Sequence, residues 1–76
     1  MSQDVEKIVE IVKRVGELDA LTADQDFYKA GVDSMRGMDI MLDLESEFGV
    51  TVPDDQFVKA RTPYDLAALV GRLRTE

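Results

Sequence analysis

The chain has 76 residues and contains no cysteine, histidine or tryptophan; its 16 acidic and 9 basic residues give a net charge of −7 at pH 7. This length allows one small domain, which we assign to residues 1–76. The missing residue types exclude a disulfide scaffold, a cysteine zinc site, a thiolate nucleophile and a histidine general base. The acidic balance argues against nucleic acid as a partner. We therefore expect a protein that is not an enzyme, with any reactive atoms supplied by a partner or an added group.

Hydropathy along the chain also indicates where in the cell the protein is found. No apolar run approaches the roughly 18 residues that would span a membrane. The first twenty residues lack the basic start and apolar stretch of a signal peptide. We expect no membrane span, a cytoplasmic location and a monomer.

The first predicted element is a helix from about Asp4 to Val15. Ser2 or Asp4 is expected to cap its start, and Gly16 to end it. Its apolar residues recur at helical spacing: Val5, Ile8, Val9, Ile11, Val12 and Val15. Residues 17–33 follow without a clean period and predict a long loop, which Leu21 and Phe27 attach to the core. One helical turn is expected in this loop, near residues 26–29.

Three further helices follow the loop. The second is predicted from Ser34 to about Phe48, with Gly49 as its stop. A short third helix is predicted after Pro53, over residues 54–60. The last helix is expected to begin at Pro63 after the N-cap Thr62, with a stripe formed by Leu66, Leu69, Val70 and Leu73. The predicted fold class is all-α: a four-helix bundle of three main helices, one short third helix and a long first loop.

The second predicted helix has two apolar faces. One face, with Gly37 among its residues, is the expected core face: Ile40, Met41, Leu44 and Phe48. The other contains Met35, Met38 and Leu42, flanked by Asp39 and Glu45. Either a wide core-facing surface takes up this second stripe, or the stripe is a docking surface of adaptable methionines with an acidic rim. For a short chain without catalytic groups, we favour docking.

Ser34, at the start of this helix, also has two interpretations. Serine is a common helix N-cap, and without a histidine base it is a poor nucleophile. A helix N-terminus also favours negative charge, so Ser34 could instead hold a phosphate. A calcium-binding loop that starts at Asp24 is excluded, because Lys29 and Met35 occupy the positions of the expected glycine and glutamate.

Several segments together resemble the acyl carrier protein family. The resemblance rests on Gly31-Val32-Asp33-Ser34-Met35, on Leu44-Glu45-Ser46-Glu47-Phe48-Gly49, on Val52-Pro53-Asp54-Asp55 and on a Thr-capped last helix. It implies that Ser34, preceded by the family's acid Asp33, carries 4′-phosphopantetheine. The resemblance also implies that a phosphopantetheinyl transferase adds this group from coenzyme A with magnesium. The thiol at the end of the phosphopantetheine group then holds cargo as a thioester.

The resemblance also implies partner contacts through the second helix. The docking positions are Met35, Arg36, Met38, Asp39, Leu42 and Glu45, with the two acids meeting basic patches on the transferase, on a cargo-loading ligase or acyltransferase and on downstream enzymes. Arg36 and the helical Gly37 depart from the family pattern. Core or cargo-pocket positions are Phe27, Ile40, Met41, Leu44, Phe48, Val52, Phe57 and Ala60.

Three functions remain open from the sequence. The Phe27-Tyr28-Lys29-Ala30-Gly31 segment favours a stand-alone carrier of a specialised polyketide, nonribosomal peptide or aminoacyl pathway. The alternatives are a housekeeping fatty-acid carrier and a non-carrier helical interaction domain in which Ser34 is only a cap.

Overall fold

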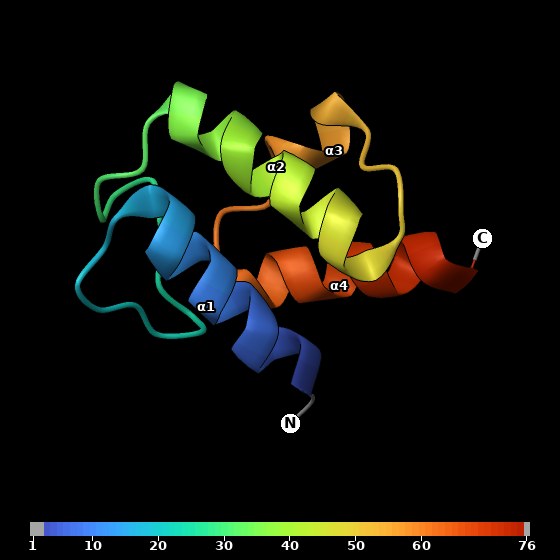
Figure 1. Cartoon of the computed structure of the whole chain (residues 1–76), viewed down its shortest axis with the longest axis horizontal. Coiled ribbons are helices and arrows are strands. Elements are labelled where there is room, and N and C mark those ends of the chain that lie inside the picture. The colour runs from blue at the N-terminus through green and yellow to red at the C-terminus, as the bar shows by residue number, and fades with distance from the viewer. Residues whose placement is uncertain (1–2, 76) are drawn as a thin grey trace.

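The computed structural model describes residues 3–75, which form four helices and no strand. They are α1 (Gln3–Gly16), α2 (Ser34–Phe48), α3 (Asp54–Phe57) and α4 (Pro63–Thr75). Helix α1 packs against both α2 and α4, while α3 contacts α4. The long α1–α2 loop lies at one end of the bundle (Figure 1). The predicted all-α architecture is confirmed.

The core lies where the apolar stripes of the helices meet. Buried side chains come from every helix and from the loop, and no polar or charged side chain is buried within residues 3–75. Burying one such aliphatic or aromatic side chain contributes about 1.5–3 kcal/mol to the free energy of unfolding. A domain of this size therefore needs nearly all of its apolar stripes to remain folded. The largest fully buried side chains are Phe27, Ile8, Ile40, Leu44, Leu66, Leu69, Val12 and Val70.

Helix α1 ends at Gly16, as predicted, but the left-handed position belongs to the residue after it. Gly16 is the last helical residue, and Glu17, with φ +56°, takes the left-handed position that follows. The backbone N–H of Leu18 donates to Lys13 O at 2.9 Å, and that of Glu17 donates to Arg14 O at 3.3 Å. This is the Schellman pattern, in which glycine usually occupies the left-handed site.

Glycine is needed at position 16, one residue before the left-handed position, because of packing. A Cβ on Gly16 would lie 2.8 Å from Val32 Cγ2, closer than two carbons can approach. The helix end and the loop therefore meet at a position that only glycine fits. At the other end of α1, Ser2 lies outside the described residues. Asp4 lies inside the helix and pairs with Arg74 rather than acting as a cap.

The loop between α1 and α2 is attached as predicted. Leu21 and Phe27 are buried, and the Ala30 N–H donates to Asp26 O at 3.1 Å, closing a single helical turn. The Phe27 N–H reaches across to Arg61 O at 2.9 Å. This bond joins the loop to the segment before α4.

The remaining boundaries agree with the sequence except at α3. Helix α2 ends at Phe48, and Gly49 (φ +66°) donates its N–H to Glu45 O. Helix α3 ends at Phe57 rather than at residue 60, because the N–H groups of Lys59 and Ala60 donate to carbonyl groups three residues back instead of four. Thr62 caps α4: its Oγ1 accepts the Asp65 N–H at 3.1 Å.

The contact at Gly16 gives a stability prediction. We expect Gly16→Ala to destabilise the domain by about 1–3 kcal/mol, because Val32 or the helix end must shift. Gly71→Ala is the matched control: Gly71 lies within α4 with nothing within 4 Å of the added Cβ. It should stabilise the domain by about 0.5–1 kcal/mol through helix propensity. Urea unfolding checks both, and equal effects of the two substitutions would contradict the packing argument.

Candidate functional site

The start of α2 leaves Ser34 exposed. Asp33, not Ser34, is the N-cap: it has extended backbone (φ −92°, ψ −179°), and its Oδ1 accepts the Arg36 N–H at 2.9 Å. Ser34 is the first helical residue. The interpretation of Ser34 as the helix cap is therefore wrong, because the aspartate carboxylate already takes that role.

Arg36 connects the start of α2 to the end of α1. Its guanidinium donates to Val15 O at 3.1 Å and lies 2.8 Å from Glu17 Oε2. The bond to Glu17 raises the pKa of Arg36, so its charge is secure. The cation thus satisfies an end carbonyl of α1 and pairs with the residue in the left-handed site. The sequence analysis placed Arg36 among the docking residues. In the structure, its guanidinium instead binds Val15 O and Glu17 within the domain.

The second apolar stripe of α2 is exposed. The residues have relative exposures of 80% (Met35), 58% (Met38) and 55% (Leu42). Ile40, Met41 and Leu44 on the other face are buried, as predicted, and Phe48 is half-buried. The interpretation that the core takes up the second stripe is therefore wrong. Grouped apolar side chains in water on one helix are typical of a partner surface.

The two acids expected beside this stripe differ in their surroundings. Asp39 is exposed. Glu45 is partly buried, and its Oε2 accepts the Val52 N–H at 2.8 Å, which attaches the chain after α2 to the helix. A change at Glu45 would therefore alter the fold as well as the surface charge, whereas Asp39 can be changed alone.

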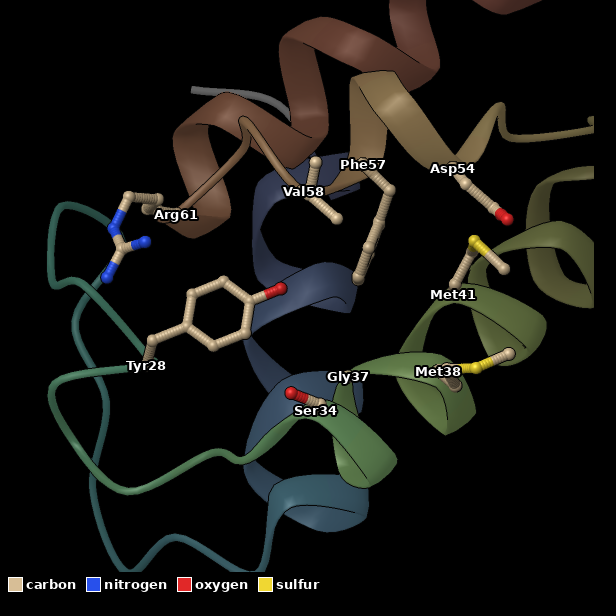
Figure 2. A pocket seen from close by; sticks show the side chains of 9 residues that line it. All are labelled: Tyr28, Ser34, Gly37, Met38, Met41, Asp54, Phe57, Val58 and Arg61. Carbon is tan, nitrogen blue, oxygen red and sulfur yellow. The ribbon is translucent and has the colours of Figure 1, made fainter.

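A cavity of about 370 Å³ opens beside Ser34 (Figure 2). It lies between the first turns of α2, helix α3 and the loop residue Tyr28. Its lining residues are Tyr28, Ser34, Gly37, Met38, Met41, Asp54, Phe57, Val58 and Arg61. Of the cargo-pocket residues expected from the sequence, Met41 and Phe57 line the cavity, while Phe27, Val52 and Ala60 are buried in the core.

Asp26, Tyr28 and Arg61 form a cluster that the sequence did not indicate. Asp26 Oδ2 accepts from Arg61 Nε at 2.7 Å, and its Oδ1 accepts the Tyr28 N–H at 3.0 Å. The Arg61 guanidinium lies 5.0 Å from the Tyr28 ring centroid, a cation–π arrangement. Because 35 residues separate Asp26 from Arg61, no local pattern marks the pair.

The geometry at Ser34 suits a covalently attached phosphate group. The hydroxyl is exposed at the positive end of a 15-residue helix, where a phosphodiester is favoured. The adjacent cavity, lined mainly by apolar groups, leaves space beside the attachment point. No helix within the described part of the chain is long and apolar enough to cross a bilayer.

Comparison with known proteins agrees with this geometry. The family model described as phosphopantetheine attachment site matches residues 6–70. The chain is 39% identical over 72 residues to a D-alanyl carrier protein from Leuconostoc citreum, covering 90% of this chain and 92% of that protein. It is also 39% identical over 74 residues to the chloroplastic acyl carrier protein 1 of Spinacia oleracea, covering 93% of this chain and 54% of that protein.

Further relatives extend the same group. An acyl carrier protein from Rickettsia bellii is 30% identical over 64 residues, which is 80% of this chain and 74% of that protein. The chain spans about half the length of the chloroplastic relatives that it matches. The chain belongs to the phosphopantetheine-attachment family of carrier proteins. The cofactor of this family is 4′-phosphopantetheine, bound covalently.

The Asp26–Arg61 pair gives a pH prediction. The hydrogen bond from Arg61 holds the pKa of Asp26 below its ordinary value of 3.8. A lowered carboxyl pKa in the folded state adds stability above pH 3.8, and this part is lost as the pH falls through the folded-state value. We therefore expect Asp26→Asn to lose less stability than the parent between pH 7 and pH 3, measured as urea midpoints.

The control for this experiment is Asp19→Asn, which changes an exposed carboxylate of the same loop. Its loss of stability between pH 7 and pH 3, measured as urea midpoints, should equal that of the parent. If Asp26→Asn also follows the parent, the ion pair does not contribute to acid sensitivity.

Proposed function

We propose that this chain is a discrete, non-catalytic carrier protein and that Ser34 Oγ is its attachment atom. The observation that carries the proposal is the exposed Ser34 hydroxyl at the start of α2, with the cap role taken by Asp33. Bound there, the phosphopantetheine group supplies a terminal thiol on which biosynthetic intermediates are held as thioesters. The domain supplies the attachment atom, the helix end and the surface that partners recognise.

Modification of Ser34 requires a partner enzyme. As part of the proposal, the chain is the substrate of a phosphopantetheinyl transferase that uses coenzyme A. The N-terminus of α2 favours the phosphodiester that results. Asp33 holds this end of the helix in place through the Arg36 N–H, so the serine is presented on a rigid element.

The partner surface in this proposal is the exposed stripe of Met35, Met38 and Leu42. Methionine side chains adapt to several partners, which suits a protein that visits a transferase, a loading ligase or acyltransferase and downstream enzymes. Asp33 and Asp39 lie on the same helix end and attract basic patches. Both Arg36 and Glu45 make contacts within the domain, so the docking role rests on the other residues.

The cargo belongs to a specialised pathway in this proposal. A match spanning nearly the full length of both chains is with a protein named D-alanyl carrier protein, which supports the aminoacyl branch. The alternative of an interaction domain in which Ser34 is only a cap loses its basis, because Asp33 is the cap. A monomer in the cytoplasm completes the proposal.

The attachment site is tested by modification in vitro. Incubation with coenzyme A and a broad-specificity transferase should add one phosphopantetheine to the parent, and Ser34→Ala should abolish the mass gain while keeping the helical circular dichroism. Intact-mass spectrometry gives the result.

The matched control is Ser46→Ala, which removes another exposed hydroxyl from α2. It should be modified like the parent. A parent whose mass does not change would overturn the carrier proposal, and a modified Ser34→Ala would move the attachment elsewhere.

The charged rim is tested by reversing one acid. Asp39→Lys should lower the kcat/KM of the transferase for this protein about tenfold at low salt, because it repels a basic docking patch, and the loss should shrink as salt is added. Glu10→Lys is the control, since it makes the same change in net charge at an exposed position of α1. Equal losses for both variants would show that only net charge matters.

A further inference from the structure

Tyr28 places a polar group inside an otherwise mostly apolar part of the cavity. Figure 2 shows its hydroxyl directed toward Phe57 and Val58, above Ser34 and Gly37. Within residues 3–75 this hydroxyl has no hydrogen-bond partner from the protein. It is thus a donor and acceptor available to whatever enters the cavity.

The position of the Tyr28 ring is set by its neighbours. The Asp26 carboxylate accepts the Tyr28 N–H, the Arg61 guanidinium covers one side of the ring, and the Phe27 ring lies 4.7 Å away between centroids. Arg61 is itself held by Asp26. With the backbone and ring both constrained, the hydroxyl is preorganised and little entropy is lost when it binds a ligand.

Gly37 keeps the hydroxyl accessible. A Cβ at this position would contact Tyr28 Oη at 3.5 Å, Tyr28 Cε1 at 3.6 Å and Phe57 Cε2 at 3.7 Å. An alanine would therefore fit without a clash, but its methyl group would occupy space beside the hydroxyl. Since alanine is also the better helix former, the glycine is explained by the open cavity rather than by the helix.

The volume of the cavity sets an upper limit on the length of cargo that it can enclose. At about 30 Å³ for a water-sized group, its 370 Å³ accommodates on the order of a dozen such groups. A saturated chain that covers the Tyr28 hydroxyl would strip its water and offer nothing in return, whereas a cargo with its own oxygen or nitrogen would replace that bond. Burial raises the pKa of Tyr28, so the hydroxyl stays a neutral donor at physiological pH.

We infer that Tyr28 is a specificity-determining residue, and that the cavity favours short cargo bearing a hydrogen-bonding group over a saturated chain of the same length. This inference rests on the proposed carrier function, because the cargo reaches the cavity on the arm at Ser34. Tyr28 selects the cargo by a hydrogen bond to its polar substituent. Gly37 leaves the space in which that substituent lies.

The test compares two cargoes that differ by one hydroxyl. Butyryl and 3-hydroxybutyryl arms are loaded onto Ser34 from the corresponding coenzyme A thioesters, and cleavage of each thioester by hydroxylamine is timed. The ratio of the two rates is corrected by the same ratio for free pantetheine thioesters. In the parent, we expect cleavage of the hydroxylated cargo to be about fivefold slower, the effect of one net hydrogen bond.

Substitutions identify the group responsible. Tyr28→Phe removes only the hydroxyl and should bring the corrected ratio to about one. Tyr64→Phe is the matched control on α4, with an exposed tyrosine outside this cavity, and should keep the ratio of the parent. Gly37→Ala should remain folded and expose both cargoes to faster cleavage.

Each negative result is distinct. A parent that cannot be loaded contradicts the carrier proposal itself. A loaded parent with a corrected ratio of one, a Tyr28→Phe variant that keeps the ratio of the parent, or a Gly37→Ala variant with unchanged rates overturns the inference about Tyr28. Amide NMR of the protein with the arm, with and without cargo, gives a further outcome. If Tyr28→Phe changes the contacts of the arm equally in both states, the hydroxyl binds the arm rather than the cargo, and the inference also fails.

Discussion

The hydrogen bond between the Arg36 N–H and the Asp33 carboxylate sets the point at which α2 begins. Because the aspartate satisfies the free donor at the helix end, the next residue enters the helix with its hydroxyl uncommitted. Ser34 therefore lies at the positive end of α2, in water and beside a cavity. Within the helix that begins here, the spacing of Met35, Met38 and Leu42 places these three exposed side chains together on its outer side.

The two faces of α2 have different roles: the inner face packs in the core, and the outer face remains exposed. The inner face supplies Ile40 and Leu44, which are fully buried, to a core too small to lose any large side chain without serious cost. The outer face is free of that demand. Met35, Met38 and Leu42 can therefore remain in water, where they destabilise nothing and can contact other proteins. Arg36 has a separate role, because its guanidinium joins α2 to the last turn of α1.

The cavity beside Ser34 is assembled from segments that are distant in sequence. Its wall at Tyr28 comes from the first loop, and the Arg61 that holds this ring comes from the segment before α4. A backbone bond from Phe27 to Arg61 O fixes the distance between the two segments. The cluster thus joins the first loop to the segment before α4, and it holds the Tyr28 hydroxyl in the cavity beside Ser34.

The sequence by itself determined the helices and most of the core, because helical periodicity and caps are local signals. The Asp33-Ser34-Met35 motif is also local, and it singled out the serine that we propose as the attachment site. The sequence also indicated two faces on α2, since spacing within one helix is independent of what packs against it. The tertiary structure alone decided three points: which face is exposed, that Arg36 and Glu45 bond within the domain, and that Gly16 meets Val32. It also brought Asp26, Tyr28 and Arg61 together. These contacts join residues from different elements, and whether a side chain is buried, paired or free depends on the atoms that the folded chain brings beside it.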